Sequence, residues 1–313
     1  MEHIKGLKII VLNVYMTIKH LVISGGGPLC IRYLGCLKIL LNESYITMSN
    51  IENIYCTSSG SLVATALALR YNIDIIQDYF INRPWHEVFK ISPLQVLEYY
   101  KSKGVFSKHQ FELFLSPLLK GKDLDPNITL KDFYEYSKIH IHFNCVEMND
   151  ETIQPVSISH TNFPDLPLKH ALQMTSSIPF LIEPLVIDNK LYIDGGLLTN
   201  YTSNICLEDG HKEEECLGLW FKVDDPSSQE NDTIKVNTDL NLFHFFYLYN
   251  YKINQYLLNL NKPQELTSQI KCVLQKRPMN IEVSQEILKN KELRKTWWED
   301  GENDAKQYLN SRI

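Results

Sequence analysis

The sequence predicts an α/β fold with a mainly parallel central sheet and a helical C-terminal extension. Two βα units in series support this prediction. In the first, the apolar run Leu21 to Ser24 ends at three glycines, and apolar residues then recur at helical spacing from Pro28 to Asn42. In the second, the apolar run Ile51 to Tyr55 precedes the Ala- and Leu-rich stretch Leu62 to Arg70. Successive βα units lay their strands side by side in one direction, so the sheet is expected to be parallel.

Composition and charge limit the classes of protein to which the chain can belong. Its 313 residues are 44% hydrophobic, enough for one large α/β core with at most a small second module. The formal net charge is −6, and there is no dense run of Lys and Arg. Because nucleic-acid binding needs a basic surface that neutralises phosphates, we do not expect a nucleic-acid partner. A lipid partner is compatible with this charge, since a local basic or apolar rim suffices for docking at a membrane.

The cysteines and the N-terminal segment indicate the cellular compartment in which the protein is expected. An odd number of widely spaced cysteines without a CxxC pair fits neither a disulfide framework nor a zinc site, so we expect an intracellular location, cytoplasmic or peripheral to a membrane. The apolar stretch Leu7 to Ile18 is interrupted by Asn13, is too short to span a bilayer and precedes no cleavage site. We interpret it as a buried strand, with a weak signal anchor as the alternative. The cysteines are Cys30, Cys36, Cys56, Cys145, Cys206, Cys216 and Cys272.

The rest of the chain alternates between short strands and helices. Residues 74–136 have the pattern of helices and loops with breaks at Pro84, Pro93, Pro117 and Pro126, and form a candidate lid or side wall. The further expected elements are a hairpin over 139–147 and 152–158, a helix over 168–176, strands over 191–193 and 216–223, and tail helices over 240–260 and 281–298.

The first tail helix is rich in aromatic side chains between Leu242 and Tyr256. Such a helix either packs into a core or lies at a membrane surface. Interfacial helices usually carry Lys or Arg along their polar face, and this segment has only Lys252. We therefore expect core packing, with membrane contact as the alternative.

Three short motifs carry the candidate chemistry. Ser58 lies in the run Cys56-Thr57-Ser58-Ser59-Gly60, where an apolar strand ends and a helix begins. A sharp turn of this kind holds a serine hydroxyl clear of the backbone and near amide N–H groups, as acyl transfer requires. Taken alone, Ser58 is more simply a helix cap, Gly25–Gly27 a phosphate-binding turn and Asp194-Gly195 an ordinary turn. Their order, spacing and predicted secondary structure together favour a hydrolytic site.

In this order the motifs resemble those of the patatin-like phospholipase family. The glycine-rich oxyanion segment of that family is similar to Gly25–Gly27, its GxSxG elbow to residues 56–60, and its Asp-Gly-Gly/Ala motif to Asp194–Gly196. Residues 169–180 and the predicted hairpin up to residue 159 are also similar to the corresponding patatin segments. The resemblance implies a three-layer patatin-like fold. It divides the chain into an apolar segment over 1–19, an acyl hydrolase domain over 20–207, and a C-terminal strand and mainly helical extension over 208–313.

The resemblance implies a serine acyl hydrolase that cleaves phospholipids or other lipid esters through a Ser-Asp dyad. Ser58 is then the nucleophile and Asp194 the general base, while the backbone N–H groups of Gly25, Gly26 and Gly27 stabilise the oxyanion. A carboxylate can serve as this base if it contacts the hydroxyl directly and is partly desolvated. The chemistry of the family requires no metal or organic cofactor. The residues that support the motifs are Gly60, Gly195 and Gly196.

Two departures from the family pattern leave alternatives open. Cys56 replaces the first glycine of GxSxG, and Leu29-Cys30 stands where the family usually has Arg or Lys followed by Gly. The main alternative to a hydrolase is a catalytically silent protein of the same fold that binds lipid or a protein partner. A Ser-Asp-His triad with His211 or His244 is a further alternative, although both histidines are more simply interpreted as residues of a charged loop and of a helix face.

Overall fold

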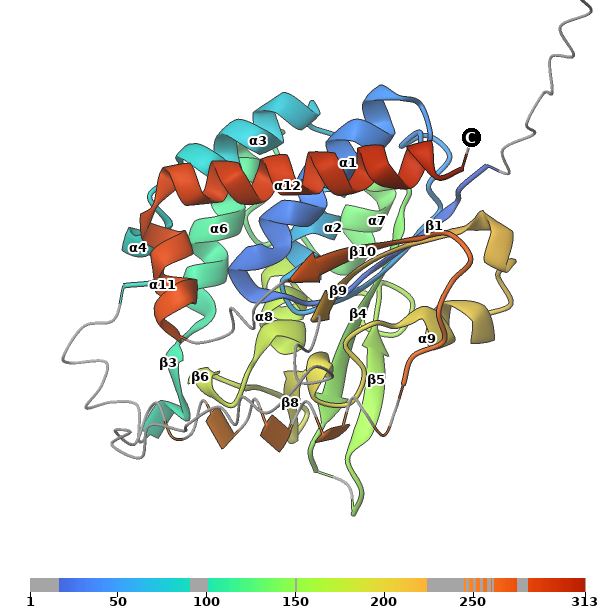
Figure 1. Cartoon of the computed structure of the whole chain (residues 1–313). Coiled ribbons are helices and arrows are strands. Elements are labelled where there is room, and N and C mark those ends of the chain that lie inside the picture. The colour runs from blue at the N-terminus through green and yellow to red at the C-terminus, as the bar shows by residue number, and fades with distance from the viewer. Residues whose placement is uncertain are drawn as a thin grey trace, which may run out of the picture.

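An eight-stranded sheet forms the centre of the computed structural model (Figure 1). The structure describes residues 17–90, 101–149, 151–223, 262–274 and 281–312, together with individual residues between 245 and 260. The predicted strand over Leu7 to Ile18 lies almost entirely outside these residues. The strands are β1 (His20–Ile23), β2 (Asn53–Thr57), β3 (Gly104–Phe106), β4 (His140–Glu147), β5 (Gln154–Ile158), β6 (Phe180–Ile182), β7 (Leu185–Ile187), β8 (Lys190–Asp194), β9 (Cys216–Val223) and β10 (Gln269–Leu274).

The order of strands in the main sheet confirms the predicted α/β fold with a mainly parallel sheet. The order is β10-β9-β1-β2-β4-β8-β7, and β5 pairs with β4. Neighbours from β10 to β4 run parallel, whereas β8, β7 and β5 are added antiparallel. Ile23 pairs with Cys56 at the ends of β1 and β2. The loops that follow these two strands therefore leave the sheet side by side.

Along each strand the side chains alternate between the two faces of the sheet, and apolar side chains on both faces are buried. Leu21, Ile23 and Ile54 point into the larger hydrophobic core, whereas Val22 and Tyr55 belong to a smaller cluster on the other face. That smaller cluster includes Cys206 of α9 and Cys216 of β9. Successive side chains of a strand point to opposite faces, so an uninterrupted apolar strand is buried between two layers.

Several helices begin where the sequence offers a capping side chain. Asn72, Ser107 and Thr129 each accept a hydrogen bond from a backbone N–H of the first turn, and Ser107 forms a full capping box with Gln110. The helices are α1 (Ile31–Asn42), α2 (Gly60–Ala68), α3 (Ile73–Asn82), α4 (Trp85–Val88), α6 (Lys108–Lys120), α7 (Leu130–Ser137), α8 (Leu168–Ser176), α9 (Ser203–Glu208), α11 (Ile281–Lys289) and α12 (Lys291–Asn310), with short 3-10 turns η1 (Gly27–Cys30), η2 (Gly195–Leu197) and η3 (Glu213–Glu215).

Pro117 does not break a helix, contrary to the sequence-based expectation, and lies inside α6. A proline at this position cannot donate a hydrogen bond to the carbonyl of Leu113, four residues earlier. Arg83 supplies the missing donor, because its Nη2 lies 2.8 Å from that carbonyl oxygen. The helix therefore continues past the proline with the freed carbonyl group satisfied.

The C-terminal helix α12 lies directly on α1 (Figure 1). A Cβ atom added to Gly35 of α1 would lie 2.0 Å from the Trp298 carbonyl oxygen, and one added to Gly301 of α12 would lie 1.9 Å from the Arg32 carbonyl oxygen. The two backbones therefore touch, and Trp298 is fully buried. The helix expected over 281–298 is in fact two helices, because Asn290 caps the start of α12 through the N–H of Leu293.

The aromatic tail segment is more exposed than the expected core packing predicts, although Leu248 and Leu257 are half-buried. Large apolar side chains spaced three or four residues apart are between 39% and 64% exposed there. Pieces of this segment are drawn along the lower edge of Figure 1, far from α3 at the top. Within the described part of the chain, no helix combines the length and the hydropathy that crossing a bilayer requires. The exposed tail residues are Phe245, Tyr249, Ile253, Tyr256 and Leu260.

Candidate active site

Ser58 occupies a sharp turn between β2 and α2. Its φ angle is +51°, in the left-handed region that non-glycine residues enter at a cost of roughly 1 kcal/mol. The backbone N–H of Ser58 offsets this cost by donating to both the carbonyl oxygen and Oγ1 of Thr175, at 3.1 and 3.0 Å. A Cβ on Gly60 would lie 2.5 Å from the carbonyl oxygen of Ile23, so only glycine lets α2 start this close to β1.

Asp194 ends β8 next to this turn. Thr57 pairs with Asn144, and the following residue of β4, Cys145, pairs with Asp194, so the sheet register brings the ends of β2 and β8 together. The Asp194 side chain is 6% exposed and accepts the N–H of Gly196 at Oδ1, 2.7 Å away.

The environment of Asp194 makes its carboxylate more basic. Burial raises the pKa of Asp194 to about 6, while hydrogen bonds from the Ser58 side chain and the Gly196 N–H act in the opposite direction. The structure therefore brings the two predicted catalytic residues close enough for the Ser58 side chain to lower the pKa of Asp194. At neutral pH such a carboxylate is largely ionised and a stronger proton acceptor than an exposed aspartate.

The glycine loop after β1 lies against Ser58. A Cβ on Gly25 would lie 2.8 Å from Cβ of Ser58, so any larger residue would displace the serine. Two of the three predicted oxyanion donors have partners within the protein: the N–H of Gly25 donates to Asn200 Oδ1 and that of Gly26 to Ser59 Oγ, both at 3.0 Å. Gly27 has a φ angle of +54° and begins η1. Its N–H donates to no acceptor among the described residues.

Comparison with known proteins identifies the family. A family model described as patatin-like phospholipase matches residues 21–205. The chain belongs to the patatin-like phospholipase family. This match confirms the resemblance that the three motifs predict, and it spans the glycine loop, the Ser58 turn and the Asp194 turn.

The chain is similar to proteins of two viruses. Uncharacterized protein R571 of Acanthamoeba polyphaga mimivirus is 27% identical over 273 residues, which cover 86% of this chain and 84% of that protein. Probable lipid hydrolase 463L of Invertebrate iridescent virus 6 is 24% identical over 209 residues, covering 65% of this chain and 68% of that protein. The crystal structure of VipD from Legionella pneumophila aligns with a TM-score of 0.49 and 15% identity, over 95% of this chain and 67% of VipD.

Asn200 is the site residue that sequence reasoning missed. It ends the run that begins with the Asp-Gly-Gly motif of patatins, and the six-residue spacing from Asp194 was the available signal. Its Oδ1 accepts the N–H of Gly25 at 3.0 Å, and its Nδ2 donates to the carbonyl oxygen of the same residue at 3.1 Å. The segment that follows Asp194 and the glycine loop are thus joined by one side chain.

The cysteines at the two departures from the patatin pattern are both buried. Cys56 points into the core and donates from Sγ to the carbonyl oxygen of His142, 3.3 Å away. Cys30 lies near Ser59, and burial raises the pKa of its thiol to about 12 although a hydrogen bond with Ser59 lowers it. Both thiols are protonated at neutral pH because burial raises the pKa of each.

The structure brings His211 to the other end of the strands from Ser58. Its ring stacks on that of His20, with centroids 3.7 Å apart, and its Nε2 lies 3.0 Å from the Tyr55 hydroxyl. His20 is the first residue of β1 and pairs with Asn53 at the start of β2, whereas Ser58 follows the end of β2. His244, the other histidine considered for a triad, lies outside the described residues.

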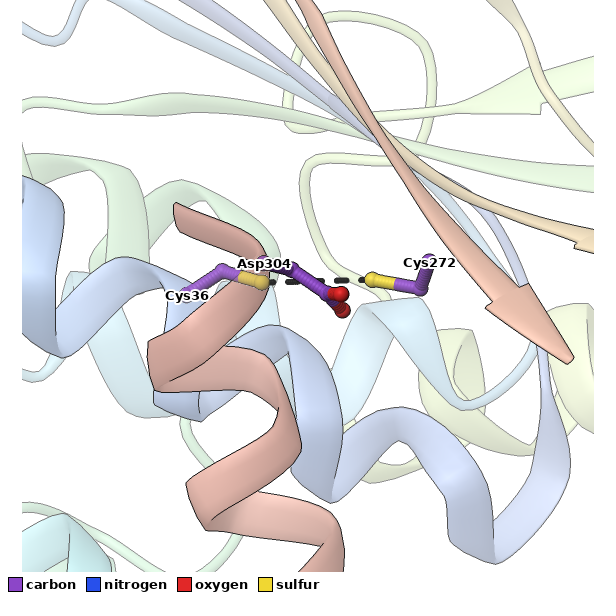
Figure 2. Close-up of side chains that lie close together, drawn as sticks. All are labelled: Cys36, Cys272 and Asp304. Atoms are coloured by element: carbon purple, nitrogen blue, oxygen red, sulfur yellow. Dashed lines mark hydrogen bonds between the residues drawn. The ribbon is translucent and has the colours of Figure 1, made fainter. Parts of the chain in front are cut away.

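A cluster of two thiols and a carboxylate lies between α1, β10 and α12. Figure 2 shows Cys36, Cys272 and Asp304, whose ligand atoms lie within 4.8 Å of one another. Arg32 already binds both oxygens of Asp304, with Nε 2.6 Å from Oδ2 and Nη2 2.8 Å from Oδ1. A metal ion would have to displace this guanidinium or bear its positive charge nearby. The cluster is therefore a partly buried ion pair beside two buried thiols, and the ion pair joins α12 to α1.

Proposed function

We propose that the protein is a serine acyl hydrolase that cleaves lipid esters through Ser58 and Asp194. Oγ of Ser58 attacks the ester carbonyl carbon while Asp194 takes the hydroxyl proton, giving a tetrahedral oxyanion. Collapse of this intermediate expels the alcohol, which receives the proton from Asp194, and leaves an acyl-enzyme. Water then attacks the acyl group while Asp194 again accepts a proton. Collapse of this second intermediate releases the carboxylic acid, and Asp194 returns the proton to Oγ of Ser58.

The observation that carries this proposal is the pairing of a strained serine turn with a buried carboxylate. Ser58 holds a positive φ angle, and the pKa of Asp194 is raised to about 6 by burial. Strained backbone and perturbed pKa values tend to cluster at functional sites, where they form part of the mechanism. Both groups are little exposed, at 8% and 6%, so the proton transfer would take place in a largely desolvated site.

We assign the substrate to lipid esters of the phospholipid or acylglycerol class. Membership of the patatin-like phospholipase family supports this class, and a viral relative bears the name probable lipid hydrolase. The exposed apolar side chains of the tail segment, including Tyr249, Ile253 and Tyr256, support peripheral contact with the membrane that holds such a substrate.

Labelling with a fluorophosphonate probe tests the proposal, because only an activated serine reacts with it. The wild type is expected to label and to hydrolyse short-chain nitrophenyl esters, whereas Ser58→Ala and Asp194→Asn lose both properties and stay folded. The matched controls are Ser49→Ala and Asp188→Asn, two exposed positions expected to leave activity unchanged. A wild-type protein that neither labels nor cleaves any ester would instead support the catalytically silent, lipid-binding alternative. Full activity in either site variant would exclude the dyad.

A further inference from the structure

We infer that Asn200 is a positioning residue of the proposed site: its carboxamide clamps Gly25 and so sets the glycine loop against Ser58. This inference rests on the proposed acyl hydrolase function and adds a residue to it. With the N–H of Gly25 bound to Asn200, the donors left to face an oxyanion are those of Gly26 and Gly27. Gly26 reaches it only when its present partner, the rotatable hydroxyl of Ser59, turns away.

The carboxamide of Asn200 makes one hydrogen bond with each backbone polar group of Gly25. It accepts from the Gly25 N–H and donates to the Gly25 carbonyl oxygen, at 3.0 and 3.1 Å, so it pairs with one residue much as a neighbouring strand would. An aspartate at position 200 would keep the acceptor but lose the donor, and its second oxygen would face the carbonyl oxygen of Gly25. Two hydrogen bonds to one residue fix its orientation as well as its distance.

Asn200 is itself held by a rigid neighbour. Nδ2 of the buried Asn144 on β4 donates to the Thr199 carbonyl oxygen at 2.7 Å and to Thr57 Oγ1 at 3.3 Å. A Cβ on Gly195 would lie 2.3 Å from the Asn144 carbonyl oxygen, so the turn after Asp194 is pressed against the same strand. The segment from Asp194 to Asn200 is thus fixed to the sheet. The two hydrogen bonds of Asn200 in turn fix the glycine loop to this segment.

The clamp also lies close to the general base. A Cβ on Gly196 would be 3.0 Å from Asp194 Oδ1 and 3.2 Å from Asn200 Oδ1, so the two side-chain oxygens border one small space. A negative charge at position 200 would therefore repel the ionised form of Asp194 and favour its protonated form. The pH dependence of the reaction therefore distinguishes a positioning residue from a merely structural one. Replacing Asn200 with aspartate should change that pH dependence.

The test compares Asn200→Ala and Asn200→Asp with the control Asn189→Asp, at an exposed residue in the turn just before β8. Both site variants are expected to lower kcat for a short-chain nitrophenyl ester by roughly 10- to 100-fold with little change in KM, since misplacement of about 1 Å has such an effect on catalysis. Asn200→Asp should also move the acidic limb of the pH–rate profile about one pH unit higher, whereas Asn200→Ala should not. The control should match the wild type in both respects.

Hydrogen exchange at the Gly25 amide provides a readout that does not depend on activity. The wild-type amide is expected to exchange slowly, and Asn200→Ala should accelerate its exchange at least tenfold while buried β1 amides stay protected. If the wild type is active and both variants keep kcat within twofold, the positioning role is wrong and the proposed function stands. If the wild type is inert, the proposed function fails, and an unprotected Gly25 amide in the wild type would overturn the clamp as well.

Discussion

The thiol of Cys56 donates a hydrogen bond to the carbonyl oxygen of His142, 3.3 Å away on the neighbouring strand β4. Cys56 is fully buried and stands two residues before Ser58, where the family motif has glycine. Because its side chain points into the core and satisfies a strand carbonyl group, the cysteine fills space that glycine would leave empty. It does not press on the Ser58 turn.

We therefore expect Cys56→Gly to weaken the fold without improving catalysis. Loss of the buried side chain and the added backbone freedom should lower the free energy of unfolding by about 2 kcal/mol. Chemical denaturation and ester hydrolysis per folded molecule, measured on the same samples, check both parts. A large gain in rate with unchanged stability would instead mean that Cys56 impairs catalysis.

The pH dependence of ester hydrolysis follows from the raised pKa of Asp194. In the proposed mechanism only the ionised carboxylate takes the proton of Ser58, so kcat/KM should rise with pH through an apparent midpoint near 6 and then level off. A pH–rate profile of the wild type with a neutral ester checks this. A midpoint near 4, typical of an exposed aspartate, would contradict the buried-base assignment.

The same burial predicts that Asp194→Asn stabilises the protein. The folded-state pKa lies above the unfolded value of 3.8, so ionised Asp194 opposes folding at neutral pH. This effect weakens as the pH falls below the folded pKa and is gone below the unfolded value. Replacement by asparagine should raise the free energy of unfolding at pH 8 by roughly 2 to 3 kcal/mol. Urea unfolding at pH 8 and pH 4 tests the sign, and a variant less stable than the wild type at pH 8 would refute it.

Histidines stacked at the starts of β1 and β4 make the fold sensitive to acid. Burial, followed by neighbouring histidines, lowers the pKa of His20 and His140 to about 4 and that of His142 to about 3. Because these values lie below the unfolded value of 6.5, their contribution to stability is complete above that pH. It is lost as the pH falls toward 4. Urea midpoints measured between pH 7 and pH 4.5 should decrease steadily.

His140→Phe isolates this effect, because phenylalanine keeps the stacking and Nε2 of His140 has no hydrogen-bond partner among the described residues. Between pH 7 and pH 4.5, this variant should lose about 1 kcal/mol less stability than the wild type. This figure allows for the partial exposure of His140. The control is His109→Phe at an exposed position of α6. Equal acid sensitivity of the His140 variant and the wild type would count against the histidine origin.

Contact between α1 and α12 predicts that Gly301→Ala is strongly destabilising. The new Cβ would lie 1.9 Å from the Arg32 carbonyl oxygen and would force the two helices apart, at a cost of about 3 kcal/mol. Thermal unfolding measures this loss. Glu299→Ala, an exposed change on the same helix, should stay within about 0.5 kcal/mol of the wild type. Equal effects of the two substitutions would mean that the helices are not in backbone contact.

Exposed apolar residues of the tail predict binding to lipid vesicles. The double variant Ile253→Ser, Tyr256→Ser should bind phosphatidylglycerol-containing vesicles roughly tenfold more weakly than the wild type in a flotation assay, since each side chain contributes buried apolar area. Ile75→Ser is the matched control, because Ile75 is 52% exposed on α3, away from the tail in Figure 1. Unchanged binding by the double variant would remove the tail from the membrane contact.

Much of this architecture could be predicted from local sequence. The strand before Gly25, the Ser58 turn and the hairpin of β4 and β5 are all marked by apolar periodicity that ends at glycine or polar residues. The helix predicted over 168–176 and the strand over 216–223 have the observed bounds. These features depend on neighbours within a few residues, so periodicity in the sequence is enough to predict them.

Tertiary structure alone decided how these pieces meet. Asn200 and Gly25 are 175 residues apart, and their two hydrogen bonds follow from the register of β1, β2, β4 and β8. Packing between distant segments also produces the contact of α12 with α1. It likewise brings Arg83 to the carbonyl group that Pro117 leaves without a donor. A local pattern sets the type of an element and the face that it buries. The atoms that finally come within hydrogen-bond distance are set by packing between segments far apart in the chain, and no periodicity in the sequence encodes that packing.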